Sequence, residues 1–415
     1  MDSVTQAVVL CGGRGERLRP LTNYLPKPMV EVNGRPFLFY LLDQLSAQGI
    51  SRFVLLTGYL GESINEYFGD GSTWGWSITY SHGPTEWQTA TRISKAIEDL
   101  DEKFLLLYSD NFAQLHLAEL IKLSIKNSSA ITLSIAEKSP GNIEIDSDGV
   151  VVNYDESRTG GGSSHVEIGY SLVVKEQVYA HLKDLSTESF TVVINELVKD
   201  KKVSALLVKS GYRSISDPLR LEQTSNYLKP KKVLLLDRDG TLNKKSLPGE
   251  YINSLSEFIW IESSRSALKI LAQNGFSFIV ITNQAGVSLG KTKLRNLEAI
   301  HDQLRADFQS DGLKLLDIYV CTDNWESESE FRKPKPGMFF LASKDHNFRL
   351  DHAIYVGDDV RDGLAAGNAG CECLLLSSTF NTEVLDPSVV SVGKSLSDLV
   401  PTILKRYQHW SEIVK

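Results

Sequence analysis

An apolar run that ends abruptly in two aspartates constrains this chain more than any other stretch. Residues 233–236 read Val-Leu-Leu-Leu, and Asp237, Asp239 and a Gly-Thr pair follow them. Such a run predicts a buried parallel strand, and open α/β sheets bind ligands beyond the carboxyl ends of their strands. Two carboxylates this close repel each other unless a cation or a proton joins them. A simple Asp-Gly turn needs no second aspartate, so the stretch predicts a site at a sheet edge.

The 415 residues of the chain exceed one typical domain and predict roughly two or three. Apolar strands alternate with helical patterns up to about Asn226, which is typical of βαβ sheets. A short polar hinge with Pro230 follows, and a fresh series starts at Val233 and continues to about Leu376. We therefore expect an α/β protein with two domains, residues 1–228 and 229–415.

Composition restricts the partners and the compartment. The net charge of -8 argues against a nucleic-acid partner held by bulk charge. No apolar run approaches the ~20 residues of a membrane span, and the start of the chain lacks the basic region of a signal peptide. Four cysteines are spaced neither as a disulfide framework nor as a four-ligand zinc site: Cys11, Cys321, Cys371 and Cys373. We expect a cytoplasmic protein with no membrane partner, and we expect Cys371 and Cys373 to be packing residues on the last strand.

Three further polar groups complete the site that begins at Asp237. Thr282 and Asn283 end the apolar run 278–281, Lys333 follows Arg332, and Asp358 ends the apolar run 354–357. The order is a nucleophile, a hydroxyl, a cation and an acid pair, because Asp359 follows Asp358 directly and Asp362 stands nearby. Because most of these groups follow apolar runs, they can converge at one edge of a parallel sheet.

This constellation resembles the haloacid-dehalogenase-like phosphatase superfamily, and within it the heptose-bisphosphate and histidinol-phosphate phosphatase branch. The resemblance implies a doubly wound parallel sheet without a large cap. It also implies that Asp237 attacks phosphorus to form an aspartyl-phosphate, and that Asp239 protonates the leaving oxygen and then activates water. Thr282 would bind the phosphoryl group, and Lys333 would offset its charge.

The same resemblance implies a magnesium ion and a substrate pocket. Mg²⁺ would be held by Asp237, Asp358 and the main-chain carbonyl of Asp239, while Asn283 and Arg332 would contact the substrate. The branch usually carries a zinc loop of Cys and His residues. Phe331 stands where one of those cysteines is expected, so we expect no zinc.

In the first domain, a glycine-rich loop follows the first apolar strand. The segment Gly12-Gly13-Arg14-Gly15-Glu16-Arg17 precedes Pro26-Lys27-Pro28. A glycine turn alone is equally a tight turn, but the full run resembles the sugar-1-phosphate nucleotidyltransferase family, whose sheet is Rossmann-like. Residues 33–38, 58–59 and 67–71 are most similar to its heptose-1-phosphate guanylyltransferase branch.

That resemblance implies roles for five residues. Gly12, Gly13 and Arg17 would hold the phosphates of a nucleoside triphosphate, and Lys27 would neutralise the phosphate in transfer. Asp110, which closes the strand 104–108, would bind Mg²⁺.

The first domain also departs from the family pattern. Glu156-Ser157-Arg158 replaces a Glu-Lys-Pro segment, which leaves Glu156 as a substrate-binding candidate. Ser214 stands where the family has a second metal-binding aspartate, and Asp217 could substitute only after a local shift. The arginine at position 92 resembles a feature of the cytidylyltransferase branch of the family. GTP is therefore the favoured nucleotide and CTP the alternative.

Together the two resemblances predict a bifunctional enzyme of sugar-nucleotide synthesis. It would remove the 7-phosphate of a heptose 1,7-bisphosphate and transfer a nucleotidyl group to the sugar 1-phosphate. In the alternative, a phosphatase for heptose bisphosphate or histidinol phosphate is fused to a degenerate, non-catalytic binding domain. The partners in both cases are small sugar phosphates and a nucleotide.

Overall fold

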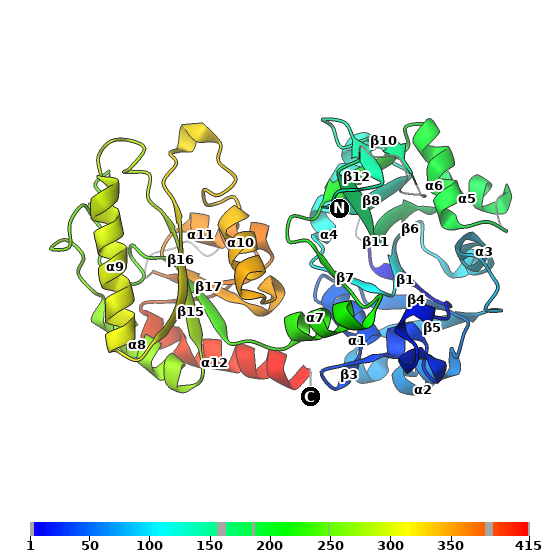
Figure 1. Ribbon diagram of the computed structural model, residues 1–415, viewed down its shortest axis with the longest axis horizontal. Coiled ribbons are helices and arrows are strands. Elements are labelled where there is room, and N and C mark those ends of the chain that lie inside the picture. Colours follow the sequence, from blue (N-terminus) through cyan, green and yellow to red (C-terminus); the bar gives the residue numbers. More distant parts are fainter. Residues whose placement is uncertain (1–3, 156–162, 185–186, 248, 378–384, 414–415) are drawn as a thin grey trace. The chain divides into compact units, whose positions relative to one another are not determined.

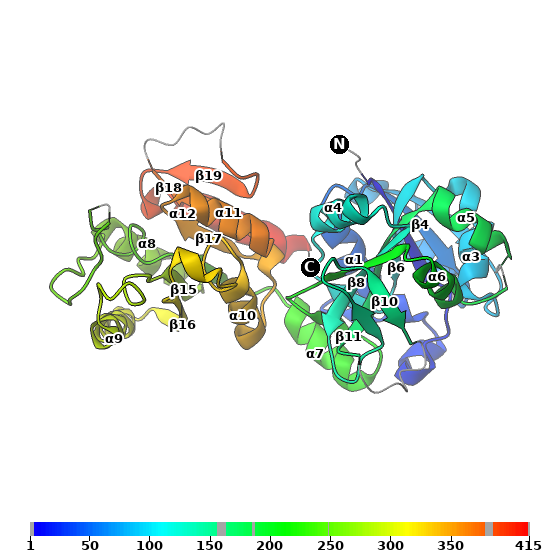
Figure 2. The ribbon, with the colours of Figure 1, turned by 90° about the horizontal axis from the view of Figure 1, so that it is seen from above.

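A computed structural model describes residues 4–155, 163–184, 187–247, 249–377 and 385–413. The chain divides into two compact units, Met1–Ser225 and Asn226–Lys415. The division falls inside the helix α7 (Pro218–Leu228). Figures 1 and 2 show the elements of both units.

The first unit is built from short strands and seven α-helices among its described residues. The strands are β1 (Gln6–Cys11), β2 (Glu31–Val32), β3 (Arg35–Pro36), β4 (Arg52–Thr57), β5 (Ser77–His82), β6 (Lys103–Tyr108), β7 (Asn111–Ala113), β8 (Ile131–Glu137), β9 (Ile143–Ile145), β10 (Val151–Tyr154), β11 (His165–Val174), β12 (Val203–Leu207) and β13 (Tyr212–Ser214). The helices before α7 are α1 (Phe37–Ser46), α2 (Glu62–Phe68), α3 (Thr89–Lys95), α4 (Leu117–Asn127), α5 (Lys175–Asp184) and α6 (Phe190–Lys199).

A mixed sheet of nine strands organises this unit. Its path runs β10-β9-β11-β6-β1-β4-β5, and β8 pairs with β11 and β12. The central strand β1 lies parallel to both β4 and β6, whereas β11 lies antiparallel to β6. Because β1 and β6 are parallel neighbours, with Leu10 opposite Tyr108, the glycine-rich loop and the segment after Tyr108 emerge at the same edge.

Alternation along β1 sends its apolar side chains to both faces of the sheet. Val8 and Leu10 pack in one core with Ile93 of α3 and Ile194 of α6. All six residues of β1 are buried, as expected for a central strand covered on both sides. The rigid strand therefore fixes where the loop after Cys11 begins.

The second unit holds a parallel sheet with helices on both faces. Its strands are β14 (Val233–Leu236), β15 (Ser277–Asn283), β16 (Lys314–Cys321), β17 (Ile354–Gly357), β18 (Glu372–Leu376) and β19 (Val389–Gly393). Its helices are α8 (Glu262–Gln273), α9 (Leu294–Ser310), α10 (Gly337–His346), α11 (Val360–Ala369) and α12 (Leu396–Ile413). The order is β16-β15-β14-β17-β18-β19, and every pair is parallel.

The central strand β14 shows how the layers form. Leu234 and Leu236 pack with residues of α8, α9 and α12, whereas Val233 and Leu235 pack with residues of α10 and α11. This arrangement confirms the doubly wound sheet. The described segment between Thr282 and Lys333 supplies only α9, β16 and a short 3₁₀ turn, so the unit has no large cap there.

The expectation that the strand series ends near Leu376 was wrong by one strand, because β19 extends the sheet beyond β18. Its residues Val-Val-Ser-Val-Gly lie half-buried at the edge of the sheet. An apolar pattern of only five residues, interrupted by a serine, is too short to identify a strand from the sequence. Cys371 and Cys373 are both buried, beside and within β18. Among the described residues, no helix is long and apolar enough to span a membrane.

Candidate active sites

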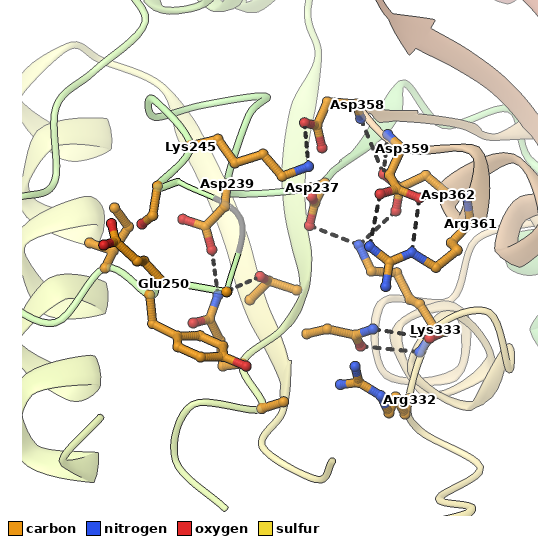
Figure 3. A pocket seen from close by; sticks show the side chains of 18 of the residues that line it. Asp237, Asp239, Lys245, Glu250, Arg332, Lys333, Asp358, Asp359, Arg361 and Asp362 are labelled. Atoms are coloured by element: carbon orange, nitrogen blue, oxygen red, sulfur yellow. Dashed lines mark hydrogen bonds and ion pairs between the residues drawn. The ribbon is translucent and has the colours of Figure 1, made fainter. Parts of the chain in front are cut away.

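In the second unit, one cavity of about 480 Å³ gathers every residue predicted for the first constellation (Figure 3). These are Asp237, Asp239, Thr282, Asn283, Arg332, Lys333 and Asp358. Asp237 follows β14 directly, and its backbone N–H donates to the Val356 carbonyl of the neighbouring strand at 2.8 Å. The parallel sheet therefore brings the strand ends to a common edge, as the positions of the apolar runs indicate.

A buried ammonium group joins two of the carboxylates. Lys333 Nζ lies 2.8 Å from Asp237 Oδ1 and 2.9 Å from Asp362 Oδ1, and it also donates to the Tyr355 hydroxyl. The side chain of Lys333 is 5% exposed. A charge this deeply buried requires paired partners, so the two aspartates and the lysine form one structural unit.

Asn283 holds the backbone of Lys333. Its side-chain Nδ2 donates to the Lys333 carbonyl at 3.0 Å, and its Oδ1 accepts from the Lys333 N–H at 3.1 Å. The sequence predicted Asn283 as a substrate contact. The structure engages both of its amide atoms in positioning the lysine, a contact that the sequence did not indicate.

The buried triad shifts the pKa of its members. Burial raises the pKa of Asp237 to about 7, against the opposing effect of Lys333 and with a further contribution from Asp362. Burial alone would lower the pKa of Lys333, but the two carboxylates outweigh it and raise that pKa. Lys333 is therefore charged at neutral pH, and a second cation near Asp237 would favour its ionised form.

An acidic cluster next to Lys333 has the composition of a magnesium site. Asp237, Asp358 and Asp362 each offer a carboxylate oxygen, and these atoms lie within 4.8 Å of one another. Hard oxygen ligands of this kind suit Mg²⁺. In the rest of the described chain, no second group of three such side chains was found.

The members of this cluster differ in their other contacts. Asp362 Oδ2 accepts from the backbone N–H groups of Asp358 and Asp359 at 3.1 Å, and its Oδ1 accepts from Lys333. Asp358 has one ion pair, from Oδ2 to Lys245 Nζ at 2.7 Å. Asp362 is thus committed to shaping the turn into α11, which leaves Asp237 and Asp358 as the better ligands for a cation.

Asp239 is held by a different set of donors. Arg238 Nη2 lies 2.8 Å from Asp239 Oδ2, Asn243 Nδ2 lies 2.9 Å from Oδ1, and Gln284 Nε2 lies 2.7 Å from Oδ2. Burial would raise the pKa of Asp239, but Arg238 and the two amides outweigh it and lower that pKa. The sequence reasoning missed Arg238 and Gln284, although both adjoin residues that it selected.

Thr282 and Arg332 complete the wall of the cavity. Thr282 is 1% exposed, and its Oγ1 accepts from Gln284 Nε2 at 2.9 Å. Arg332 Nη1 donates to the Asp323 carbonyl at 2.9 Å. This bond fixes the guanidinium beside the segment between Cys321 and Phe331, where the related phosphatases usually carry a zinc loop.

In the first unit, a second cavity of about 490 Å³ lies at the carboxyl ends of β1 and β6. Its wall includes the predicted residues Gly12, Gly13, Arg17, Lys27 and Asp110. Lys27 Nζ lies 2.7 Å from Asp110 Oδ2. The predicted phosphate-binding lysine and the predicted metal ligand therefore form an ion pair.

Arg92 of α3 lies beneath the glycine-rich loop. It is 5% exposed, and its guanidinium donates to the carbonyls of Thr57 and Pro84 at 2.7 and 2.6 Å. A Cβ placed on Gly12 would lie 2.2 Å from Arg92 Cζ. An alanine at position 12 would have to displace the guanidinium of Arg92 from the carbonyls that it binds, so the loop and Arg92 depend on each other.

The structure also locates the departures from the family pattern. Ser214 pairs with Asn111 across β13 and β7, next to Asp110, and its Oγ accepts from the Ser216 N–H at 3.1 Å. Asp217 binds the backbone N–H of Arg220 at 2.9 Å in the first turn of α7. Asp217 is thus engaged in capping that helix. Glu156 lies outside the described residues.

Comparison with known proteins identifies relatives of both units. Residues 6–209 match the model of the family described as nucleotidyl transferase, and residues 232–370 match that described as polynucleotide kinase 3 phosphatase. A probable glucose-1-phosphate cytidylyltransferase of Bacillus subtilis is 30% identical over 223 residues, which are 48% of this chain and 86% of that protein. A D-glycero-beta-D-manno-heptose-1,7-bisphosphate 7-phosphatase of Haemophilus ducreyi is 34% identical over 182 residues, which are 42% of this chain and 98% of that protein.

Among solved structures, the chain is similar to a D,D-heptose 1.7-bisphosphate phosphatase from B. bronchiseptica complexed with magnesium and phosphate. The two are 29% identical with a TM-score of 0.39, and the match covers 42% of this chain and 98% of that one.

Proposed function

The chain belongs to the nucleotidyl transferase family through its first unit and to the heptose-bisphosphate phosphatase family through its second, and on this premise we propose that it catalyses two steps of sugar-nucleotide synthesis. The second unit removes the 7-phosphate of a heptose 1,7-bisphosphate. The first unit joins the remaining 1-phosphate to a nucleotide with release of pyrophosphate. The product of one reaction is then the substrate of the other.

The observation that carries the phosphatase assignment is the triad of Lys333, Asp237 and Asp362 at the end of β14. It presents a carboxylate at the floor of a cavity and keeps a cation beside it. A carboxylate that attacks a phosphate dianion needs positive charge at this place. Lys333 supplies it without occupying the whole of Asp237, because the ion pair uses Oδ1.

The proposed reaction has two halves. An oxygen of Asp237 attacks phosphorus and forms an aspartyl-phosphate, while the bond from phosphorus to the sugar oxygen breaks and Asp239 gives its proton to that oxygen. Asp239 then takes a proton from water as the water attacks phosphorus, and Asp237 is released with inorganic phosphate. Asp239 thereby regains the proton that it gave to the leaving oxygen, so the enzyme is restored.

The residues present also fit a magnesium ion. Asp237 and Asp358 would hold it through carboxylate oxygens, and the main-chain carbonyl of Asp239 would be a third ligand. When bound, Mg²⁺ supplies charge neutralisation between carboxylate and phosphate. Lys245 pairs with Oδ2 of Asp358, so its ammonium group and the ion would compete for this carboxylate.

For the first unit, the cavity above Arg92 supports a nucleotide site. Gly12 and Gly13 offer backbone N–H groups to the phosphates, and Arg17 and Lys27 offer charge. The relative from Bacillus subtilis makes CTP a real alternative to GTP.

A second candidate for this unit is a binding domain without catalysis. It is favoured by Ser214, which stands next to Asp110 and supplies no carboxylate.

Two assays on the full chain test the proposal. Phosphate release is measured with heptose 1,7-bisphosphate, histidinol phosphate and a 3′-phosphorylated oligonucleotide, and we expect the bisphosphate to be preferred. Pyrophosphate release is measured with heptose 1-phosphate and each of GTP, CTP, ATP and UTP. Phosphate release without pyrophosphate from any nucleotide would leave the binding domain as the function of the first unit.

A further inference from the structure

Asp239, the proposed proton donor, is held by a chain of buried side chains that leads away from the cavity. Arg238 Nη2 contacts both of its carboxylate oxygens, at 3.0 Å and 2.8 Å. Asp239 is 24% exposed, whereas the Arg238 side chain is 0% exposed. The contact with Arg238 therefore lies on the inner side of the carboxylate, and the exposed side faces the cavity that Asp239 lines.

The next side chain in this hydrogen-bonded series is that of His301, in the middle of α9. Arg238 Nη1 lies 2.9 Å from His301 Nε2. An arginine has only donors, so Nε2 accepts and the imidazole proton is on Nδ1. Burial, together with the charge of Arg238, lowers the pKa of His301 to about 3. The ring is therefore neutral, which is the form that can accept this bond.

The donors around Asp239 differ in how they are fixed. Gln284 is anchored through Thr282, since its Nε2 contacts both Thr282 Oγ1 and Asp239 Oδ2. Arg238 neighbours Asp239 in the chain and has a long side chain with several rotamers. His301 comes from a separate helix and fixes the far end of the guanidinium. Without that anchor, the guanidinium could turn away from Asp239.

We propose that His301 is a positioning residue of the phosphatase site, which anchors Arg238 and thereby holds the Asp239 carboxylate where it protonates the leaving oxygen. The inference rests on the proposed phosphatase function of this unit. In the first half-reaction the bond from phosphorus to the leaving oxygen breaks, and the proton of Asp239 moves to that oxygen. Arg238 lowers the pKa of Asp239 in the free site, and the negative charge of a bound phosphate opposes that effect and favours the protonated acid. Once the proton has moved, Arg238 stabilises the carboxylate that remains, so a fixed guanidinium favours the transfer.

The test separates leaving groups that need a proton from one that does not. The leaving group of an alkyl phosphate, such as the sugar bisphosphate, is an alkoxide that needs a general acid. The leaving group of p-nitrophenyl phosphate is a stable phenolate that does not. The quantity compared is kcat/KM, because it reports the steps up to departure of the leaving group and excludes the later attack of water.

The variants are His301→Leu, which removes the acceptor, and His301→Gln, whose Oε1 can still accept from Arg238. For His301→Leu we expect kcat/KM to fall roughly 10-fold or more with the sugar bisphosphate, as for loss of a general acid, and to change little with p-nitrophenyl phosphate. His301→Gln should remain close to wild type with both. An equal loss on both substrates, no loss on either, or a His301→Gln variant as impaired as His301→Leu would overturn the proposal.

Two controls keep the result interpretable. If His301→Leu does not fold, His301→Ala is measured against His301→Gln, and the same selective loss is expected. Asp237→Asn should abolish hydrolysis of both substrates. A wild-type chain that hydrolyses neither substrate would refute the phosphatase function itself, whereas an active chain without the selective loss would refute only the role of His301.

Discussion

The carboxylate of Asp358 occupies the space that a side chain at position 240 would need, and the residue there is Gly240. A Cβ placed on Gly240 would lie 2.1 Å from Asp358 Oδ2, and the backbone of Gly240 has a φ of +90°. The loop after Asp239 and the turn after β17 therefore meet at a point where only a glycine fits. This contact fixes one proposed magnesium ligand against the loop that carries the nucleophile.

We predict that Gly240→Ala displaces the Asp358 carboxylate and abolishes phosphate release. The matched control is Gly275→Ala in the same unit, where φ is +84° and no atom lies within 4 Å of the added Cβ. Both substitutions should cost about 1–2 kcal/mol of stability for the left-handed backbone. Only Gly240→Ala should also weaken Mg²⁺ binding, measured by calorimetry. Equal phosphatase activity in the two variants would contradict the prediction.

The variant Asp237→Asn tests the covalent step. We expect phosphate release to fall by a factor of about 10³ or more, as for loss of other enzyme nucleophiles. The fold should be retained, because Lys333 keeps Asp362 as its counter-ion at 2.9 Å. Pyrophosphate release serves as the control, since that activity belongs to the other unit and should not change. Substantial remaining phosphatase turnover would rule out Asp237 as the nucleophile.

The sequence was informative where function follows strand ends. Asp237, Thr282 and Asp358 each stand at the end of an apolar run, and parallel strands place such positions at one edge whatever the details of packing. Lys333 could be selected because its position in the order matched the family. These residues line one cavity in the structure, and their chemical roles remain predictions.

The sequence was uninformative where function depends on side-chain direction. Arg238 is a charged loop residue, for which exposure is the ordinary expectation, yet it is fully buried. His301 lies among the apolar positions of α9, where a pattern cannot distinguish a packing residue from a partner of Arg238. Likewise, nothing in the chain order indicates that Asn283 turns toward the backbone of Lys333. Such contacts depend on how helices and loops pack onto the sheet.

In the first unit, Gly12 and Gly13 offer a matched pair of substitutions. A Cβ on Gly12 would collide with Arg92, whereas a Cβ on Gly13 meets no atom within 4 Å. We therefore expect Gly12→Ala to lower the melting temperature of the unit and to abolish pyrophosphate release. Gly13→Ala should leave the melting temperature unchanged and raise the KM for the nucleotide, because its added methyl group would narrow the cavity that Gly13 lines. Phosphate release should be normal in both, and equal melting temperatures would argue against the contact with Arg92.

His301 makes the stability of the second unit depend on pH. Its pKa is about 3 in the folded chain and about 6.5 in an unfolded chain. The folded state therefore stays neutral while the unfolded state takes up a proton as the pH falls below about 6.5, so stability is lost from there toward the folded pKa. Between pH 7 and pH 5 this single group should cost about 2 kcal/mol of unfolding free energy.

The variant His301→Gln lacks this titration and isolates its contribution. In urea unfolding at pH 7 and pH 5, the free energy of unfolding should fall less for His301→Gln than for the wild-type chain, by up to about 2 kcal/mol. His409→Gln, which replaces an exposed histidine of the same unit, controls for the mere loss of an imidazole. If wild type and His301→Gln lose the same free energy between the two pH values, then His301 is not kept neutral by burial beside Arg238, and the bond from Arg238 to its Nε2 would need another explanation.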